Sequence, residues 1–214
     1  SIFKLAAFIL YLYRGAIADL GGTSVNSFLD LGASRESMPH YLRYNAKSLG
    51  SKPAFREKEY GIWQSWSWAE VEENTDSLAL GFLKLGIKEG DFVAIIGRNR
   101  PHFYWTMLAS HMVGAVPVPL YQDAVAEEMS YVLGHCGARF IVVDDQEQVD
   151  KVLEVKQNLP NLEQLIYVDP RGLRKYDHSK LHSFEAIQEQ GRGASAEQKA
   201  DLEQRIGLLT YDSI

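Results

Sequence analysis

Residues 92–123 read FVAIIGRNRPHFYWTMLASHMVGAVPVPLYQD, and this stretch decides the fold. It opens with a short apolar run that is typical of a buried strand, and apolar residues on all sides then predict a buried helix over residues 101–113. The valines that follow predict a second strand. Pro117 and Pro119 should limit it to a very short strand that breaks off at once into a loop, because proline lacks the amide that a sheet ladder needs.

The same alternation continues along the chain. We expect helices over residues 124–135 and 146–158, and strands over residues 139–143 and 164–168. Strands that alternate with helices predict an α/β fold, in which a mostly parallel sheet is flanked by helices. Beyond Pro170 the sequence becomes polar, and residues 191–205 are expected to form a loop and a solvated helix.

A different pattern precedes the first strand of this sheet. We expect a helix that ends at Gly50 and then two short strands joined by a hairpin around residues 59–61. In the second of these strands, Ile62, Trp66 and Trp68 should share one face. Tryptophans at such positions lie in the core more often than they stack on a cofactor.

Composition excludes several classes of function. The chain has 22 Lys and Arg against 28 Asp and Glu, with a formal net charge of −6, so a basic surface for nucleic acid is not expected. The single Cys136 cannot form an internal disulfide, which predicts a reducing, cytoplasmic location. His178 and His182 lie four residues apart without a third ligand, and no metal site is predicted.

Residues 1–37 are interpreted as an extension or linker, and the ordered domain is expected over residues 38–214. The apolar run at residues 5–13 is too short to span a bilayer. Three interpretations of it stay open: a signal peptide, a helix that packs on a membrane surface or on the domain, and sequence extraneous to the domain. A peripheral contact with the inner membrane and a homodimer are likewise left open.

Two loops follow strands at the edge of the sheet where ligands commonly bind. The first is GRNRP at residues 97–101, and the second is LYQD at residues 120–123. Each can also be explained as a capped turn, because Asn99 and Asp123 are good helix caps and Pro101 suits a first helical turn. The residues alone leave both interpretations open.

Four segments, taken together, resemble one enzyme family. They read PAFREKEYGIWQSWSWAEV, LGIKEGDFVAIIGRNRPHFYW, MVGAVPVPLYQD and DDQEQVDKVLEVKQNLPNLEQLIYVDPRG. Their order and spacing are similar to the amino-terminal part of AMP-forming acyl-CoA synthetases of the long-chain fatty acid type, which belong to the adenylate-forming superfamily. The pieces SWSWAEV and MVGAVPVPLY resemble the first two motifs of that superfamily, and the resemblance covers residues 38–214.

The resemblance implies an enzyme that activates a fatty acid with ATP and Mg²⁺ to an acyl-adenylate and then transfers the acyl group to CoA. The family's phosphate loop and carboxyl-terminal lid are not in this sequence, so a truncated fragment is expected that is inactive alone and binds no cofactor tightly. No catalytic residue is assigned. Tyr121, Gln122 and Asp123 correspond to the CoA side, and Asn99 and Arg100 to a structural helix start.

Two alternatives remain. The chain could be a non-catalytic binding or dimerisation module that keeps the fold. It could also belong to a ligase for another carboxylic acid, because the family's carboxylate pocket lies mostly outside this sequence. The length of the acyl chain therefore cannot be predicted from these residues.

Overall fold

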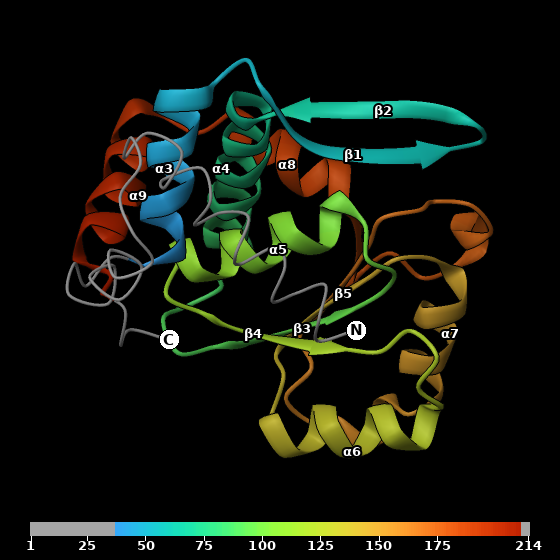
Figure 1. Cartoon of the computed structure of the whole chain (residues 1–214). Coiled ribbons are helices and arrows are strands. Elements are labelled where there is room, and N and C mark those ends of the chain that lie inside the picture. The colour runs from blue at the N-terminus through green and yellow to red at the C-terminus, as the bar shows by residue number, and fades with distance from the viewer. Residues whose placement is uncertain (1–36, 211–214) are drawn as a thin grey trace, which may run out of the picture.

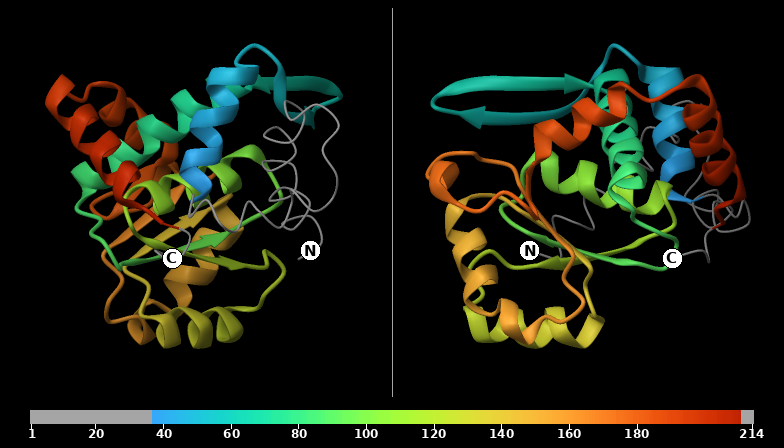
Figure 2. Two further views of the ribbon diagram at one scale, coloured as in Figure 1. Left: turned by 60° about the vertical axis from the view of Figure 1, so that its left-hand side comes forward. Right: turned by 180° about the vertical axis from the view of Figure 1, so that it is seen from behind.

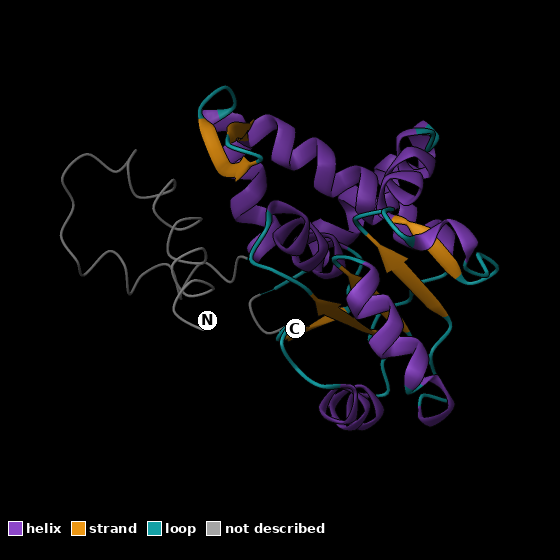
Figure 3. Cartoon of the chain, turned by 90° about the vertical axis from the view of Figure 1, so that its right-hand side faces the viewer, coloured by secondary structure: helices purple, strands orange, loops and turns teal. Residues whose placement is uncertain are grey.

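The structure is a computed structural model that describes residues 37–210, which fold around a five-stranded parallel sheet of order β4-β3-β5-β6-β7 (Figure 1). Its strands are β3 (Phe92–Ile96), β4 (Val116–Leu120), β5 (Phe140–Val143), β6 (Gln164–Tyr167) and β7 (Leu181–Ser183). A separate antiparallel hairpin consists of β1 (Pro53–Glu59) and β2 (Ile62–Ser67) (Figure 3). The predicted α/β fold is confirmed. The predicted extension lies outside the described residues except for Ser37 and stays a prediction.

Helices cover both faces of the sheet (Figures 1 and 2). On one side lie α3 (Met38–Leu49), α4 (Trp68–Leu85), α5 (Pro101–Met112), α8 (Phe184–Arg192) and α9 (Ala196–Leu208). On the other side lie α6 (Ala126–Cys136) and α7 (Gln146–Glu154), together with the short 3₁₀ turn η2 (Lys156–Asn158); a second turn, η3 (Leu173–Lys175), follows β6. Among residues 37–210, no helix is both long and apolar enough to cross a membrane.

The central strands divide the core into two parts. Val93 and Phe140 belong to the apolar cluster that includes α4 and α5, whereas Ala94 and Ile141 belong to the cluster with α6 and α7. Successive side chains of a strand point to opposite faces, so a strand that is apolar at every position must be covered on both sides. The uninterrupted apolar sequences of β3 and β5 are explained by this geometry.

The prediction of a short strand followed by a loop is confirmed, but the prolines do not interrupt the strand. β4 runs for five residues, and every one of them pairs with β3. The prolines are tolerated because β4 lies at the edge of the sheet and pairs on one side only. Residues two apart direct their backbone nitrogens the same way, so both missing donors can face the free edge without loss of a ladder bond.

The prediction that Ile62, Trp66 and Trp68 share one strand face holds only for Ile62 and Trp66, which lie four residues apart in β2. Ile62 and Trp63 are both 64% exposed, whereas Trp66 packs edge-on against Trp105 with ring centroids 5.8 Å apart. Trp68 is buried, but it is the first residue of α4 and not part of the strand. The strand ends at Ser67, whose side chain accepts a hydrogen bond from the backbone of Glu70 and so starts the helix.

The polar carboxyl-terminal segment is more ordered than its composition predicts. β7 adds a fifth strand to the sheet, and α8 packs against α4. In α9, Leu202 and Ile206 are 2% and 3% exposed. Their spacing of four residues places them on one helix face, but two apolar residues among polar neighbours are a weak sequence signal. The predicted loop and solvated helix are confirmed, except that α9 buries one narrow apolar face at Leu202 and Ile206.

An ion-pair network attaches α9 to the helices beside it. Arg43 on α3 lies 3.1 Å from Glu72 and 2.8 Å from Asp76, both on α4, and 2.5 Å from Glu203 on α9. Burial raises the pKa of Asp76 to about 6, in spite of the opposing effect of the Arg43 charge. One arginine thus links α3 and α4 with α9, which is distant from both in sequence.

The backbones of α4 and α8 approach each other closely. A Cβ atom on Gly191 of α8 would lie 1.7 Å from the carbonyl oxygen of Ser77, and one on Gly81 of α4 would lie 2.3 Å from that of Ile187. Real Cβ atoms essentially never come within 3.0 Å of such neighbours. Because the neighbours are backbone atoms, a side chain at either glycine would force the helices apart.

We predict that Gly191→Ala lowers the free energy of unfolding by about 1–3 kcal/mol, the range typical of overpacked cores. Gly207→Ala on α9 is the matched control, because a Cβ there meets no atom within 4 Å. The control should leave the free energy unchanged or raise it by up to about 1 kcal/mol, since alanine favours helix over glycine. Urea denaturation followed by tryptophan fluorescence measures both, and equal effects would contradict the close helix crossing.

His111 on α5 predicts a pH dependence of stability. Its Nδ1 atom is buried without a hydrogen-bond partner among the described residues, and burial lowers the pKa of His111 to about 4. An unfolded histidine has a pKa of about 6.5, so the unfolded chain takes up a proton that the folded chain excludes as the pH falls from 6.5 towards 4. The contribution of neutral His111 to the free energy of unfolding is thus fully present above about pH 6.5, and it is lost as the pH falls towards 4.

Between pH 7 and pH 5 this loss should amount to about 2 kcal/mol. His111→Asn removes the titrating group. Between pH 7 and pH 5, the free energy of unfolding of the variant should therefore fall by about 2 kcal/mol less than that of the wild type. Urea denaturation at the two pH values measures the difference, to which other titrating groups contribute equally in both proteins. Parallel pH profiles of the two proteins would show that His111 does not titrate as described.

Candidate functional site: the carboxyl edge of the sheet

Three loops meet where β3, β4 and β5 end. Ile96, the last residue of β3, pairs with Leu120 of β4 on one side and with Val143 of β5 on the other. The parallel direction of the strands therefore brings the residues that follow them to one edge of the sheet. The carboxyl-edge loops are residues 97–100 after β3, 121–125 after β4 and 144–145 after β5.

A buried carboxylate anchors this edge. Asp144 is only 6% exposed; its Oδ2 accepts a hydrogen bond from Nε of Arg98 at 2.6 Å, and its Oδ1 lies 3.6 Å from Nη1 of Arg100. The two guanidinium groups offset the cost of removing the carboxylate from water. A Cβ on Gly97 would lie 2.9 Å from that of Asp144, so the close approach of the two loops depends on glycine.

Arg100 joins the hairpin to this edge. Its Nε donates to Glu57 at 2.5 Å and its Nη2 donates to Glu59 at 2.9 Å, both on β1. Phe55, on the same face of β1, stacks on Tyr104 of α5 with ring centroids 5.5 Å apart. The inner face of β1 is therefore fixed by one aromatic contact and two ion pairs.

His102 lies just inside the edge, where its surroundings disfavour the protonated ring. Burial, and next the positive charge of Arg100, lower the pKa of His102 below its ordinary value. Its ring packs against Trp105 and Phe184, with ring centroids 4.8 Å and 5.2 Å away. A cavity of about 20 Å³, which Asp144 also lines, adjoins it and is far smaller than any nucleotide.

The start of α5 differs from the predicted cap. The N-cap residue is Arg100, without a side-chain cap, and Asn99 instead accepts a hydrogen bond from the hydroxyl of Tyr104. Pro101 occupies the first turn as predicted. Asn99 thus fixes the loop to the helix without capping it.

The predicted site residues Tyr121, Gln122 and Asp123 lie together on the loop after β4. Tyr121 is 66% exposed, and Asp123 is also exposed. The carbonyl oxygen of Gln122 accepts a hydrogen bond from Nζ of Lys151 on α7 at 3.2 Å, which ties the loop to that helix. Asp123 does not cap α6, whose N-cap is Val125. The assignment of these residues to a CoA side stays a prediction.

In residues 37–210, no group of three His, Cys, Asp or Glu side chains could hold a metal ion. His178 lies in a loop and His182 on β7, so they do not share a helix face. A ring nitrogen of His182 lies 2.8 Å from the side-chain oxygen of Gln164, and one of His178 lies 3.1 Å from the carbonyl oxygen of Leu173. Both histidines are satisfied by structural contacts.

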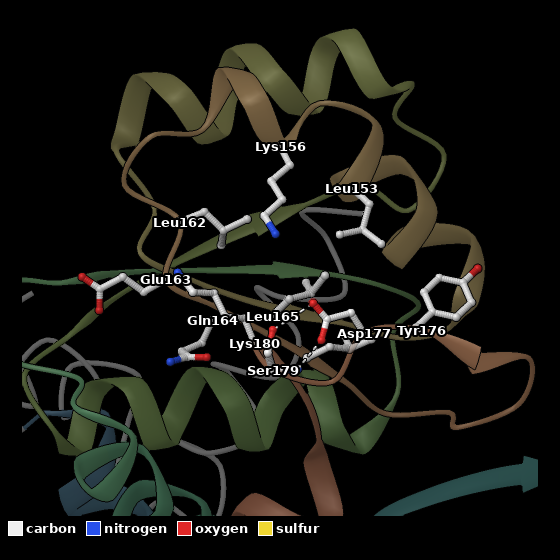
Figure 4. Close-up of a pocket in the computed structure, with 11 residues that line it drawn as sticks. Leu153, Lys156, Leu162, Glu163, Gln164, Leu165, Tyr176, Asp177, Ser179 and Lys180 are labelled. Carbon is white, nitrogen blue, oxygen red and sulfur yellow. Dashed lines mark hydrogen bonds between the residues drawn. The ribbon is translucent and has the colours of Figure 1, made fainter. Parts of the chain in front are cut away.

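A pocket of about 90 Å³ lies away from the carboxyl edge, where β6 and β7 begin (Figure 4). Its acidic groups are engaged: Asp177 accepts hydrogen bonds from the backbone and hydroxyl of Ser179, and Glu163 pairs with Arg139 at 2.7 Å. Pockets for small molecules usually measure about 300–1,000 Å³. We therefore do not assign a ligand to this pocket.

The described part of the carboxyl edge does not fit ATP with Mg²⁺. Three arginines face four carboxylates in ion pairs, namely Arg98, Arg100 and Arg171 with Glu57, Glu59, Asp144 and Asp169. Because most of these guanidinium nitrogens are paired with carboxylates, few donors are left for a polyphosphate, and residues 37–210 contain no cluster of three metal-binding side chains. No chemical step is therefore assigned to this edge.

The fold is that of adenylate-forming enzymes. The chain superposes on the acetoacetyl-CoA synthetase of Streptomyces lividans with a TM-score of 0.63 and 22% identity, over 75% of this chain and 25% of that one. The model of the family described as AMP-binding enzyme matches residues 42–205. The chain belongs to the AMP-binding enzyme family, as the resemblance of its motifs predicts.

Two curated relatives are named long-chain-fatty-acid–CoA ligases. The relative from Rattus norvegicus is 31% identical over 61% of this chain and 18% of its own length. A relative from Homo sapiens is 26% identical over 73% of this chain and 23% of its own length. The chain thus spans less than a quarter of either relative.

We predict that Arg100→Met lowers the free energy of unfolding by about 3–5 kcal/mol, because buried Asp144 and the two hairpin glutamates lose a partner. Arg205→Met is the matched control, since the Arg205 side chain is 41% exposed and, within residues 37–210, pairs only with Asp201 one helical turn away. The control substitution should lower the free energy of unfolding by less than about 1 kcal/mol. Thermal and urea denaturation compare the two variants, and similar small losses would refute an anchoring role for Arg100.

Proposed function

We propose that the chain forms the amino-terminal scaffold of a long-chain acyl-CoA ligase. In the complete enzyme, ATP activates the fatty acid carboxylate as an acyl-adenylate with release of pyrophosphate, and the thiol of CoA then displaces AMP. The observation that carries the proposal is the family match over residues 42–205. Relatives whose names specify long-chain-fatty-acid–CoA ligase support the substrate class.

The contribution of this chain is structural positioning. The described residues do not fit ATP and Mg²⁺, so we assign those groups to other parts of the complete enzyme, and the isolated chain should be inactive. Tyr121, Gln122 and Asp123 are proposed to face CoA, because their loop is exposed and lies beside the end of β3. A cytoplasmic location, predicted from the single Cys136, is part of the proposal.

A ligase for a different acid is the second candidate. It is favoured by the likeness in fold to an acetoacetyl-CoA synthetase, whose name specifies a much shorter acid than a fatty acid. A non-catalytic module is the third candidate. It is favoured by the carboxyl edge itself, where arginines are paired with carboxylates and the described residues contain no metal-binding group.

The test compares the 214-residue chain with the protein encoded by the complete native reading frame that contains it. Both are supplied with ATP, Mg²⁺ and CoA, together with palmitate, acetoacetate or benzoate, and thioester and AMP are quantified. We expect the complete protein to form palmitoyl-CoA with one AMP per thioester. The 214-residue chain should show less than about 1% of that rate, because transition-state stabilisation of phosphoryl groups is missing.

Each other outcome selects an alternative. Preference of the complete protein for acetoacetate or benzoate would replace the fatty acid with another acid. Failure of the complete protein to form thioester or to exchange pyrophosphate into ATP with any of the three acids would favour the non-catalytic module. Full activity of the 214-residue chain would overturn the assignment of a scaffold role.

A further inference from the structure

The β1–β2 hairpin carries an exposed apolar tip. Its strands extend beyond α4 and α8, the helices beside them (Figures 1 and 2). In the hairpin tip, residues 60–63, Tyr60 is 79% exposed, and Ile62 and Trp63 are both 64% exposed. Single exposed apolar residues are common on protein surfaces, but three large ones within four residues indicate a surface that makes a contact.

The backbone of the tip is strained at an aromatic residue. Tyr60 has a φ of +47° and Gly61 a φ of +83°, so both residues lie in the left-handed region. A two-residue turn of this kind favours asparagine or aspartate before the glycine, because a bulky side chain is disfavoured there. Strain of this kind clusters at functional sites. The hydroxyl of Tyr60 accepts a hydrogen bond from Arg171, but most of its side chain remains in contact with solvent.

The two faces of the hairpin differ in charge. Both glutamates of β1 point to the inner face, where Arg100 donates hydrogen bonds to them. Arg56 and Lys58 alternate with these glutamates, are exposed and form no ion pair among residues 37–210. Lys58 is paired across the strands with Trp63, and directly opposite residues of an antiparallel pair share a face. The outer face therefore combines two unpaired positive charges with an exposed tryptophan.

We propose that the hairpin tip and the outer face of the hairpin dock on the surface of an anionic lipid membrane. Tryptophan and tyrosine favour the headgroup level of a bilayer, because their rings are apolar and their edges are polar. Lysine and arginine beside them are attracted to anionic lipids. The tip would thus enter the headgroup region, while Arg56 and Lys58 reach the lipid phosphates.

Charge complementarity favours a membrane over a second copy of the chain. The chain as a whole has a net charge of −6, so an anionic surface attracts this face and repels most others. A two-fold interface uses the same face of both copies, and here it would bring the four positive charges of two outer faces together. The tip also projects from the domain (Figure 1), whereas sites for small molecules are concave.

The test measures binding of the complete native protein to vesicles by flotation, without ATP, CoA or fatty acid. The vesicles consist of phosphatidylcholine alone or of equal parts phosphatidylcholine and phosphatidylglycerol. The wild type should bind the anionic vesicles more tightly, and added salt should weaken that preference. The apolar run at residues 5–13 is present in every variant, so differences between variants report on the hairpin.

Two substitutions separate the charged contact from the apolar contact. Lys58→Gln should weaken binding to the anionic vesicles about 5-fold and leave binding to the neutral vesicles unchanged, because one basic residue near the surface is lost. Trp63→Ala should weaken binding to both kinds of vesicle about 10-fold, because apolar area is lost from the contact. Brominated lipids should quench the tryptophan fluorescence of the wild type more than that of Trp63→Phe.

A third substitution separates binding from folding. Tyr60→Asn should weaken binding about 3-fold without lowering the midpoint of thermal unfolding, because asparagine suits the left-handed turn. A purely structural role of Tyr60 predicts the opposite pattern. Tyr131→Ala and Lys199→Gln are the matched controls: Tyr131 on α6 is 73% exposed and Lys199 on α9 is exposed, and both lie away from the hairpin. Neither control should change binding.

Failure of the wild type to bind anionic vesicles would overturn the inference, and so would equal binding by the hairpin variants and the controls. A dimer in sedimentation velocity that Trp63→Ala dissociates, without vesicle binding, would assign the hairpin to a second copy instead. The inference goes beyond the proposed function and does not rest on it. Binding through the hairpin by a protein that forms no thioester would overturn the proposed function alone, and an active ligase that does not bind vesicles would overturn the inference alone.

Discussion

The burial of β3 and β5 on both faces is the constraint on which the rest of the structure depends. Each residue of β5 is buried, and alternate residues of the two strands enter different core clusters. A two-sided apolar strand requires cover from helices on both faces of the sheet. Parallel direction then follows from the connecting helices, and it brings the loops after β3, β4 and β5 to one edge.

Charge, in addition to apolar contact, joins the hairpin to this framework. Arg100 contacts Glu57 and Glu59 on β1 and lies close to Asp144 at the end of β5. Buried ion pairs add little net stability compared with apolar packing, but they are costly to break and they have defined geometry. The arrangement therefore fixes where the hairpin sits relative to the sheet more than it stabilises the fold.

Much of the fold could be predicted from local patterns, because apolar runs and turn residues act over short distances. The strand expected over residues 139–143 is β5, Phe140–Val143, and the one expected over residues 164–168 is β6, Gln164–Tyr167. The pairing of both Pro117 and Pro119 within β4 could not be predicted, because it depends on which strand lies at the edge of the sheet. The polar composition of α9 predicts its exposed face, but it does not reveal the buried face at Leu202 and Ile206 or the distant partner Arg43.

The candidate site was less predictable for the same reason. The loop at Tyr121 was placed correctly at the edge, but the exposed guanidinium of Arg98 depends on Asp144, which is 46 residues away in sequence. Such pairs are created by tertiary structure and leave no periodic signal in the sequence. The caps assigned to Asn99 and Asp123 failed because Tyr104 provided a competing partner in one case and the helix began later in the other.

Strand order explains why the exposed arginine and the buried carboxylate meet. β3 lies between β4 and β5, and it leads to α5 on one face of the sheet, whereas β4 and β5 lead to α6 and α7 on the other face (Figure 1). Loops that leave adjacent strands in opposite directions open a crevice at the carboxyl edge, which is where open α/β sheets bind ligands. In this protein the side chain of Asp144 is buried where the loops diverge, and the absence of a side chain at Gly97 leaves room for it. The divergence of the loops thus buries Asp144, whereas the side chain of its partner Arg98 is half exposed.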